Sequence, residues 1–167
     1  MTNANLAQSY LIKARARLKA LAVLLAEKAF SDVVREAQEI VELALKGMLR
    51  EVGIEPPKWH DVGGFLLEHA ARFPLEPSTL ERLAEISARL RKEREFAFYG
   101  EIDLIPTEAY TDEDGRRAFF EAGEAVDAAN RVIAGGSPGS GGREGEASGA
   151  GATGVAGTAI GAGGEEE

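Results

Sequence analysis

The feature that most constrains the fold is a helical spacing of apolar residues through the first 134 residues. In the first segment these residues recur three or four positions apart, at Tyr10, Ala14, Leu18, Leu21 and Leu25. Such a period is the signature of a helix that buries one face. No segment alternates apolar and polar residues with period two, as a half-buried strand would. The pattern therefore predicts an all-α protein.

The same spacing, together with helix-start signals, predicts where the helices lie. Long helices are expected near residues 3–28, 31–53, 78–100 and 111–134, with one short helix after Trp59-His60-Asp61. Ser31 fits an N-cap. Ser78 and Glu81 have the spacing of a capping box, and Thr111 and Asp114 have a similar one. Long helices joined by short connections indicate an up-and-down bundle of four long helices plus one short helix.

A change in composition divides the chain at residue 135. Residues 135–167 hold 13 of the 20 glycines, no aromatic residue, and only Val155 and Ile160 as large aliphatic residues. Such a segment buries too little apolar surface to offset the loss of backbone entropy on folding. We therefore expect a helical bundle domain over 1–134, followed by a disordered, Gly-rich acidic tail over 135–167.

Charge and cysteine content exclude several functional classes. The chain has no cysteine, which excludes disulfides, thiolate metal sites and cysteine nucleophiles. Its formal net charge of −9 argues against a protein that coats nucleic acid or anionic membranes non-specifically. Neither a membrane-spanning apolar run nor the pattern of a signal peptide is present in the sequence. A cytoplasmic protein without a membrane association is expected.

One charged residue interrupts the apolar stripe of the third long helix. With Leu90 at the centre of that stripe and about 100° per residue, Arg94 falls about 40° away, inside the apolar face. A guanidinium is always charged, so a partner is required: a carboxylate, a phosphate or a second subunit. Two interpretations stay open. Arg94 either pairs with a core or interface glutamate, or is kept for a phosphate-bearing ligand or RNA.

After the first long helix, four segments follow in order: REAQEIVELALKGMLREVGI, WHDVGGFLLEHA, RLRKEREFAFYGEI and a closing helix after AYTDEDGRRAFFEA. This order resembles that of the HEPN family (higher eukaryotes and prokaryotes nucleotide-binding domains). Many members of this family are ribonucleases with an arginine, four to six arbitrary residues and a histidine near the end of the third long helix. Others bind nucleotides or pair with a minimal nucleotidyltransferase in toxin–antitoxin modules.

The motif position of the family histidine is occupied by a tyrosine in this chain. Arg94 matches the motif arginine, but the residue that follows after four others is Tyr99. In this respect the chain resembles a branch of the family that has tyrosine in that position. The resemblance implies Arg94 and Tyr99 as catalytic residues. A phenol ionises near pH ~10 and an imidazole near ~6.5, so tyrosine is the poorer general acid or base at neutral pH. On a straight helix the two positions are about 140° apart, so they converge only if the helix distorts near Gly100 or across a dimer interface.

Further candidate residues surround this motif. The predicted ligand-binding residues are Arg91, Arg94 and His60, the last matching a histidine that recurs in the family. The densest basic cluster, with aromatic residues beside it, is predicted as the RNA or nucleotide surface; it contains Arg89, Arg91, Lys92 and Arg94 with Phe96, Phe98 and Tyr99. Lys13, Arg15, Arg17 and Lys19 are interpreted as a solvated surface. The histidines, His60 and His69, lack metal-ligand spacing, so neither a metal nor another cofactor is expected.

The sequence thus predicts a HEPN domain protein that binds nucleotide or RNA and acts with a minimal nucleotidyltransferase partner in a toxin–antitoxin-like module. A metal-independent endoribonuclease with an altered Arg…Tyr motif is one alternative, and a structural dimerisation module is another. A homodimer is expected in which the Arg94 faces of two protomers meet and form one composite cleft.

Overall fold

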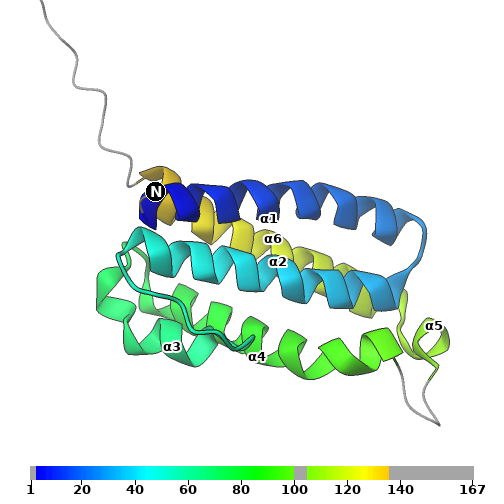
Figure 1. Cartoon of the computed structure of the whole chain (residues 1–167). Helices are drawn as coiled ribbons and strands as arrows, with labels where there is room; N and C mark the ends of the chain where they lie inside the picture. The colour runs from blue at the N-terminus through cyan, green and yellow to red at the C-terminus, as the bar shows by residue number, and fades with distance from the viewer. Residues whose placement is uncertain (1–2, 100–104, 136–167) are drawn as a thin grey trace, which may run out of the picture.

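The protein is an up-and-down bundle of four long helices, as the sequence predicted (Figure 1). The computed structural model describes residues 3–99 and 105–135, so the tail expected over 135–167 lies, apart from Gly135, outside the described residues. The long helices are α1 (Asn3–Ala26), α2 (Phe30–Glu51), α4 (Pro77–Tyr99) and α6 (Asp112–Gly135). The shorter ones are α3 (Gly63–Glu68), the 3₁₀ turn η1 (Ala70–Arg72) and α5 (Pro106–Ala109). Within these described ranges the chain forms no strand.

Helix α2 is the centre of the bundle. It packs against α1, α4 and α6, while α3 lies on α4 (Figure 1). Its fully buried side chains include Ile40, Leu45, Met48 and Leu49. Apolar residues therefore cover more than half of the α2 circumference, and only one narrow side of the helix keeps charged residues at the surface. The candidate site lies on that side.

Two predicted helix starts are wrong, each for a local reason. Helix α2 begins at Phe30 and not after Ser31, because the tight turn from α1 places Lys28 at φ 60° and Ala29 at the N-cap. Ser31 is buried in the first turn. Helix α4 begins at Pro77, whose fixed φ suits the first helical position, so Ser78 lies inside the helix and not at its N-cap.

The predicted cap of the last helix is confirmed. The Thr111 backbone N–H donates to Asp114 Oδ2 at 2.8 Å, and the Asp114 N–H donates back to Thr111 Oγ1 at 3.3 Å. A hydrogen bond from the Thr111 hydroxyl lowers the pKa of Asp114 below its ordinary value, and the hydrogen bond from the Thr111 backbone N–H adds to this effect. The reciprocal pair is a capping box with aspartate in the position usually held by glutamate.

A buried carboxylate joins α6 to α4. Glu121 of α6 is only 1% exposed, and it accepts hydrogen bonds from Arg82 at 3.3 Å, Arg117 at 3.2 Å and Arg89. Because Arg82 and Arg89 both come from α4, the two helices are tied by charge where few other contacts join them. Because Arg89 pairs with Glu121, it does not belong to the RNA or nucleotide surface predicted from the sequence.

No helix among the described residues combines the length and the apolarity needed to cross a membrane.

Candidate functional site

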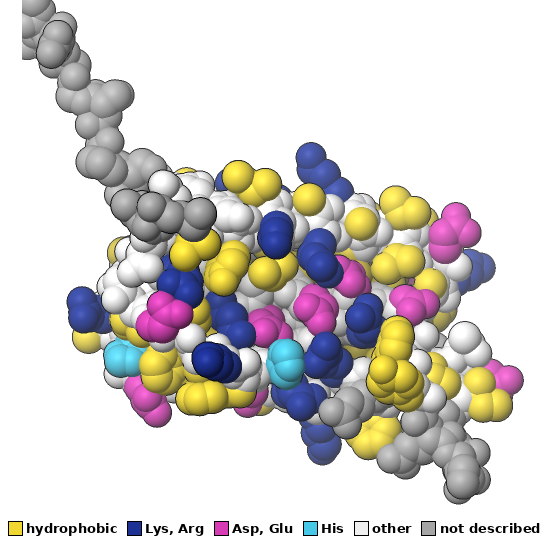
Figure 2. Space-filling model, viewed as in Figure 1, with side chains coloured by type: hydrophobic (Ala, Val, Ile, Leu, Met, Phe, Trp, Pro, Cys, Tyr) yellow, Lys and Arg dark blue, Asp and Glu magenta, His cyan; other side chains and the backbone are white. Residues whose placement is uncertain are grey.

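A row of carboxylates crosses the charged side of α2, and each carboxylate is paired with an arginine or histidine side chain from another element. The carboxylate row consists of Glu36, Glu39 and Glu42. Steps of three residues make these side chains neighbours on the helix surface. Their partners, in the same order, are Arg17 of α1 at 2.5 Å, Arg94 of α4 at 3.1 Å and His60 of the loop before α3 at 2.9 Å. Figure 2 shows this face, with carboxylates at its centre, Lys and Arg around them and a histidine among them.

The motif arginine is therefore neither a core residue nor a free one. Arg94 Nη2 donates to Glu39 Oε1, and the side chains of both residues keep 27% of their surface exposed. Of the two interpretations left open by the sequence, the carboxylate pairing is the one present in the single chain. An ion pair with this much exposure contributes only about 0–1 kcal/mol, so its carboxylate is readily exchanged for another anion.

A hollow of about 320 Å³ lies beside this ion pair, between α1 and α2. It is lined by Lys13, Ala16, Arg17, Glu39 and Leu43. Lys13 and Arg17 were interpreted from the sequence as a solvated surface, yet they line the same hollow as the carboxylate that holds Arg94. Three cations from two helices thus surround the Glu39 side chain or the space next to it.

His60 is oriented by the third carboxylate of the row. Its Nδ1 lies 2.9 Å from Glu42 Oε2, while Glu42 also accepts hydrogen bonds from Lys46 at 2.8 Å and Gln38 at 3.0 Å. Partial burial by itself raises the pKa of Glu42, but these three hydrogen bonds outweigh it, and the pKa lies below its ordinary value. A carboxylate on Nδ1 fixes the ring orientation and directs Nε2 away from Glu42. The partners of His60 and Arg94 thus lie about one helical turn apart along α2.

Tyr99 is not brought to Arg94 within one chain. Helix α4 continues through Tyr99, so the two residues keep the angular separation of about 140° expected on a helix. The Tyr99 side chain is 80% exposed and lies edge-on against Phe98 at 4.5 Å. The guanidinium of Arg35 lies over the Phe98 ring, also at 4.5 Å. The predicted catalytic pair is therefore not assembled in a single protomer.

The basic cluster predicted on α4 is divided by the helix. Arg91 lies three residues before Arg94 and is partly exposed on the neighbouring part of the helix surface. Arg89, about 140° from Arg94, points to α6 and pairs with Glu121. Lys92 is exposed about 160° from Arg94. Of the other three cations in the cluster, only Arg91 lies close to Arg94 on the helix surface.

The residues that sequence reasoning missed are the acidic ones. Glu39 and Glu42 hold the two predicted ligand residues Arg94 and His60, and the run E-x-x-E-x-x-E from residue 36 is the signal that could have found them. The second histidine, His69, lies edge-on against Phe65 at 4.8 Å. In the described ranges, no three His, Asp or Glu side chains gather as metal ligands would.

A comparison with known protein families identifies the family of this helical bundle. The model of the HEPN domain matches residues 7–133. The match spans most of the chain, and the chain therefore belongs to the HEPN family. Membership supports a role connected with nucleotides or RNA in general. Searches of the curated proteins and of the solved structures found no significant match to this chain.

Proposed function

We propose that this protein binds a phosphate-bearing ligand, a nucleotide or an RNA, on the face formed by α1, α2 and α4. The observation that carries this proposal is the position of Arg94, which is held at the surface by Glu39 beside a hollow that also presents Lys13 and Arg17. Carboxylate and phosphate oxygens accept from the same guanidinium donors. In the ligand-bound state a phosphate takes the place of the Glu39 carboxylate.

The dimensions and charge of the hollow favour a small ligand or one segment of a strand. A volume of about 320 Å³ is at the lower end of the range for small-molecule sites. Lys13 and Arg17 line the hollow, and Arg94 is paired with Glu39, which lines it as well. Phe98, 48% exposed, is an aromatic surface on the same helix as Arg94 on which a base can stack. We propose ligand-binding roles for Arg94, Arg91 and His60.

The proposal includes the partners that the family resemblance implied. We propose that the protein forms a homodimer and acts in the cytoplasm with a minimal nucleotidyltransferase, as one half of a toxin–antitoxin-like module. The test is the neighbouring reading frame. A small nucleotidyltransferase there that co-purifies with this chain supports the module, and an unrelated neighbour with no co-purifying partner contradicts it.

Binding is tested by titrating the full chain with ATP, GTP and a short single-stranded RNA. Arg94→Ala should weaken binding about tenfold or more, because a charge-assisted contact to phosphate is lost. Arg72→Ala is the matched control, since it removes one exposed arginine from η1, away from the carboxylate row. Equal affinity for wild type and Arg94→Ala, or an equal loss with Arg72→Ala, would contradict a specific site at Arg94.

A metal-independent endoribonuclease is the second candidate, and the His60–Glu42 pair is the observation that favours it. The His60 imidazole would serve as the general base, a role for which the tyrosine in the motif position is poorly suited. It would take the proton of a ribose 2′-hydroxyl, and the oxygen would attack phosphorus. The bond from phosphorus to the 5′-oxygen would break, the 5′-oxygen would take a proton from water, and a 2′,3′-cyclic phosphate would remain, with Arg94 stabilising the charge. Incubation with mixed RNA tests this candidate. Cleavage that His60→Ala abolishes and Tyr99→Phe retains supports the His60 route, whereas the opposite pattern returns the chemistry to Tyr99.

A further inference from the structure

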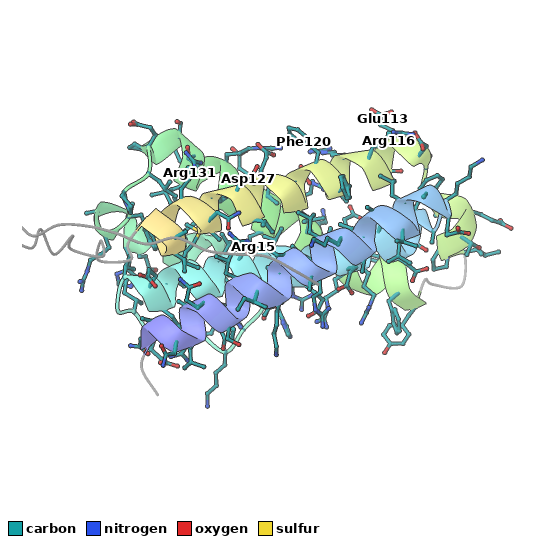
Figure 3. The ribbon with its side chains drawn as sticks, turned by 90° about the horizontal axis from the view of Figure 1, so that it is seen from above. Arg15, Glu113, Arg116, Phe120, Asp127 and Arg131 are labelled. Atoms are coloured by element: carbon teal, nitrogen blue, oxygen red, sulfur yellow. The ribbon has the colours of Figure 1, made fainter. Side chains whose placement is uncertain are left out.

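The solvent side of α6 carries a second pattern, on a different face from the carboxylate row. Its members, which we name the α6 seam, are Glu113, Arg116, Phe120, Gly123, Asp127 and Arg131. Steps of three and four residues align them along one side of the helix, as Figure 3 shows for the five that it labels. Glu113, Arg116, Phe120, Asp127 and Arg131 are all exposed.

The charges of the α6 seam are complementary to themselves when a second α6 runs antiparallel. In an antiparallel helix pair, the residue numbers of facing residues add up to nearly the same sum, within about one. Arg116 and Asp127 have the sum 243, and Glu113 and Arg131 have the sum 244. One register therefore places Arg116 opposite the partner's Asp127 and Glu113 opposite the partner's Arg131. The two-fold axis repeats both pairs, giving four ion pairs.

The same register matches shape as well as charge. Phe120 and Gly123 also have the sum 243. The Phe120 side chain is 65% exposed, although it is a large apolar residue. At Gly123 the space that a side chain would fill is open, with no atom within 4 Å. Each Phe120 ring thus meets the notch at the partner's Gly123, close to the two-fold axis.

The pattern also selects the direction of the partner helix. A parallel pair would place each residue opposite its own copy, so that Arg116 faces arginine and Asp127 faces aspartate. Like charges across an interface disfavour that arrangement. Within the part of the chain that the structure describes, Glu113, Asp127 and Arg131 make no ion pair, so their charges are available to a partner. Arg116 pairs with Asp112 at 2.5 Å on an exposed part of the helix.

We propose that a second copy of this chain docks on the α6 seam, with the two α6 helices antiparallel about a two-fold axis near residues 121 and 122. The seam spans about 18 residues, or about 27 Å. One pair of helices of this length buries less than the ~1,600 Å² of a standard interface, so the dimer has roughly micromolar affinity and weakens with added salt. This interface leaves the Arg94 face open to solvent, and it stands independently of the proposed function.

Sedimentation velocity of the full chain, over a series of concentrations, tests the proposal by charge exchange. Arg116→Glu and Asp127→Arg should each weaken dimerisation about tenfold or more, because each converts two symmetric attractions into two repulsions. Combining both substitutions in one chain should restore the dimer, since the two introduced charges are opposite and face each other across the axis. Arg72→Glu is the control for net charge and should leave the dimer unchanged. A double variant that is as weak as either single variant would overturn the register.

A second pair of variants separates this interface from the expected dimer through the Arg94 face. Phe120→Ala should weaken the dimer, whereas Phe98→Ala, which removes an exposed aromatic ring from α4, should not. A dimer that depends on Phe98 and Arg94 but not on Phe120 would overturn the α6 seam and place the two-fold axis at the Arg94 face. A wild-type chain that stays monomeric at concentrations far above the micromolar range in low salt would overturn it as well.

Discussion

Arg94 of α4 and Glu39 of α2 form an ion pair of 3.1 Å in which both side chains keep about a quarter of their surface exposed. The pair explains how an always-charged residue is accommodated in the apolar stripe of α4: Arg94 lies at the edge of the stripe, and its partner comes from the charged side of the central helix. Because the pair is partly exposed and flanks a hollow with two further cations, we interpret it as the resting state of an anion site.

Loss of the buried carboxylate in the Glu121 cluster should destabilise the bundle. In Glu121→Gln, the guanidinium of Arg89 loses the carboxylate that compensates it, and Arg82 keeps only Glu124. We expect a loss of about 3 kcal/mol in the free energy of unfolding, measured by denaturant melts. Glu124→Gln, at a partly exposed carboxylate that pairs with Arg82, is the control and should cost less than about 1 kcal/mol. Equal costs for both would show that burial of Glu121 has no energetic consequence.

The close approach of α3 to α4 requires the absence of a side chain at Gly63. A Cβ there would lie 2.7 Å from the Ala84 Cα, and backbone cannot move aside cheaply. Gly63→Ala should therefore lower the free energy of unfolding by about 1–3 kcal/mol. Gly64→Ala adds the same group where no atom lies within 4 Å and should be neutral or slightly stabilising. Thermal melts of the two variants decide the matter, and similar stability of both would refute the steric argument.

The hydrogen bonds around Glu42 should make part of the stability dependent on pH. Since the pKa of Glu42 is lowered on folding, its contribution is fully present above the ordinary carboxyl value of 4.5 and is lost as the pH falls through the folded pKa. Glu42→Gln should therefore be less stable than wild type at neutral pH, by about 1 kcal/mol. The gap should narrow below pH ~4.5. Denaturant melts of both proteins across this pH range test the prediction. A difference in the free energy of unfolding that grows on acidification would contradict it.

The hydroxyl of Tyr99 should contribute nothing to stability and nothing to binding of a nucleotide at Arg94. The side chain is 80% exposed at the end of α4 and lies against the ring of Phe98. Tyr99→Phe is expected to change the free energy of unfolding by less than about 0.5 kcal/mol. Its nucleotide affinity should equal that of wild type. A several-fold loss of affinity in the same titration would show that the phenol touches the ligand.

The four long helices were predictable because apolar period and length act locally along the chain. The short α5 was not, since four residues carry no period. The start of α2 was misplaced because Lys28 adopts a positive φ that sequence patterns rarely signal in a lysine. Arg94 was found because a charge in an apolar stripe is visible in one helix. Its partner Glu39 was not found, because the two residues are 55 positions apart in the chain and meet only where α2 and α4 pack together.

The basic cluster on α4 shows the opposite error, in which residues close in sequence were taken as close in space. Arg89 and Arg94 point to different neighbours, α6 and α2, because five residues turn a helix by about 140°. The site that remains combines Arg94 with residues of α1 and α2 that no local pattern joined to it. The packing of α1 against α2 brings Lys13, Arg17 and Glu39 around one hollow, and α4 adds Arg94 through its ion pair with Glu39.

The most direct test of the central claim, that a phosphate takes the place of the Glu39 carboxylate at Arg94, is the nucleotide affinity of Glu39→Gln measured by isothermal titration. Removing the competing charge beside Arg94, Arg17 and Lys13 should tighten binding about three- to tenfold, and the gain should shrink as salt is added. If Glu39 instead serves only to position Arg94, the same variant will bind more weakly than wild type or with equal affinity, and either result contradicts the account.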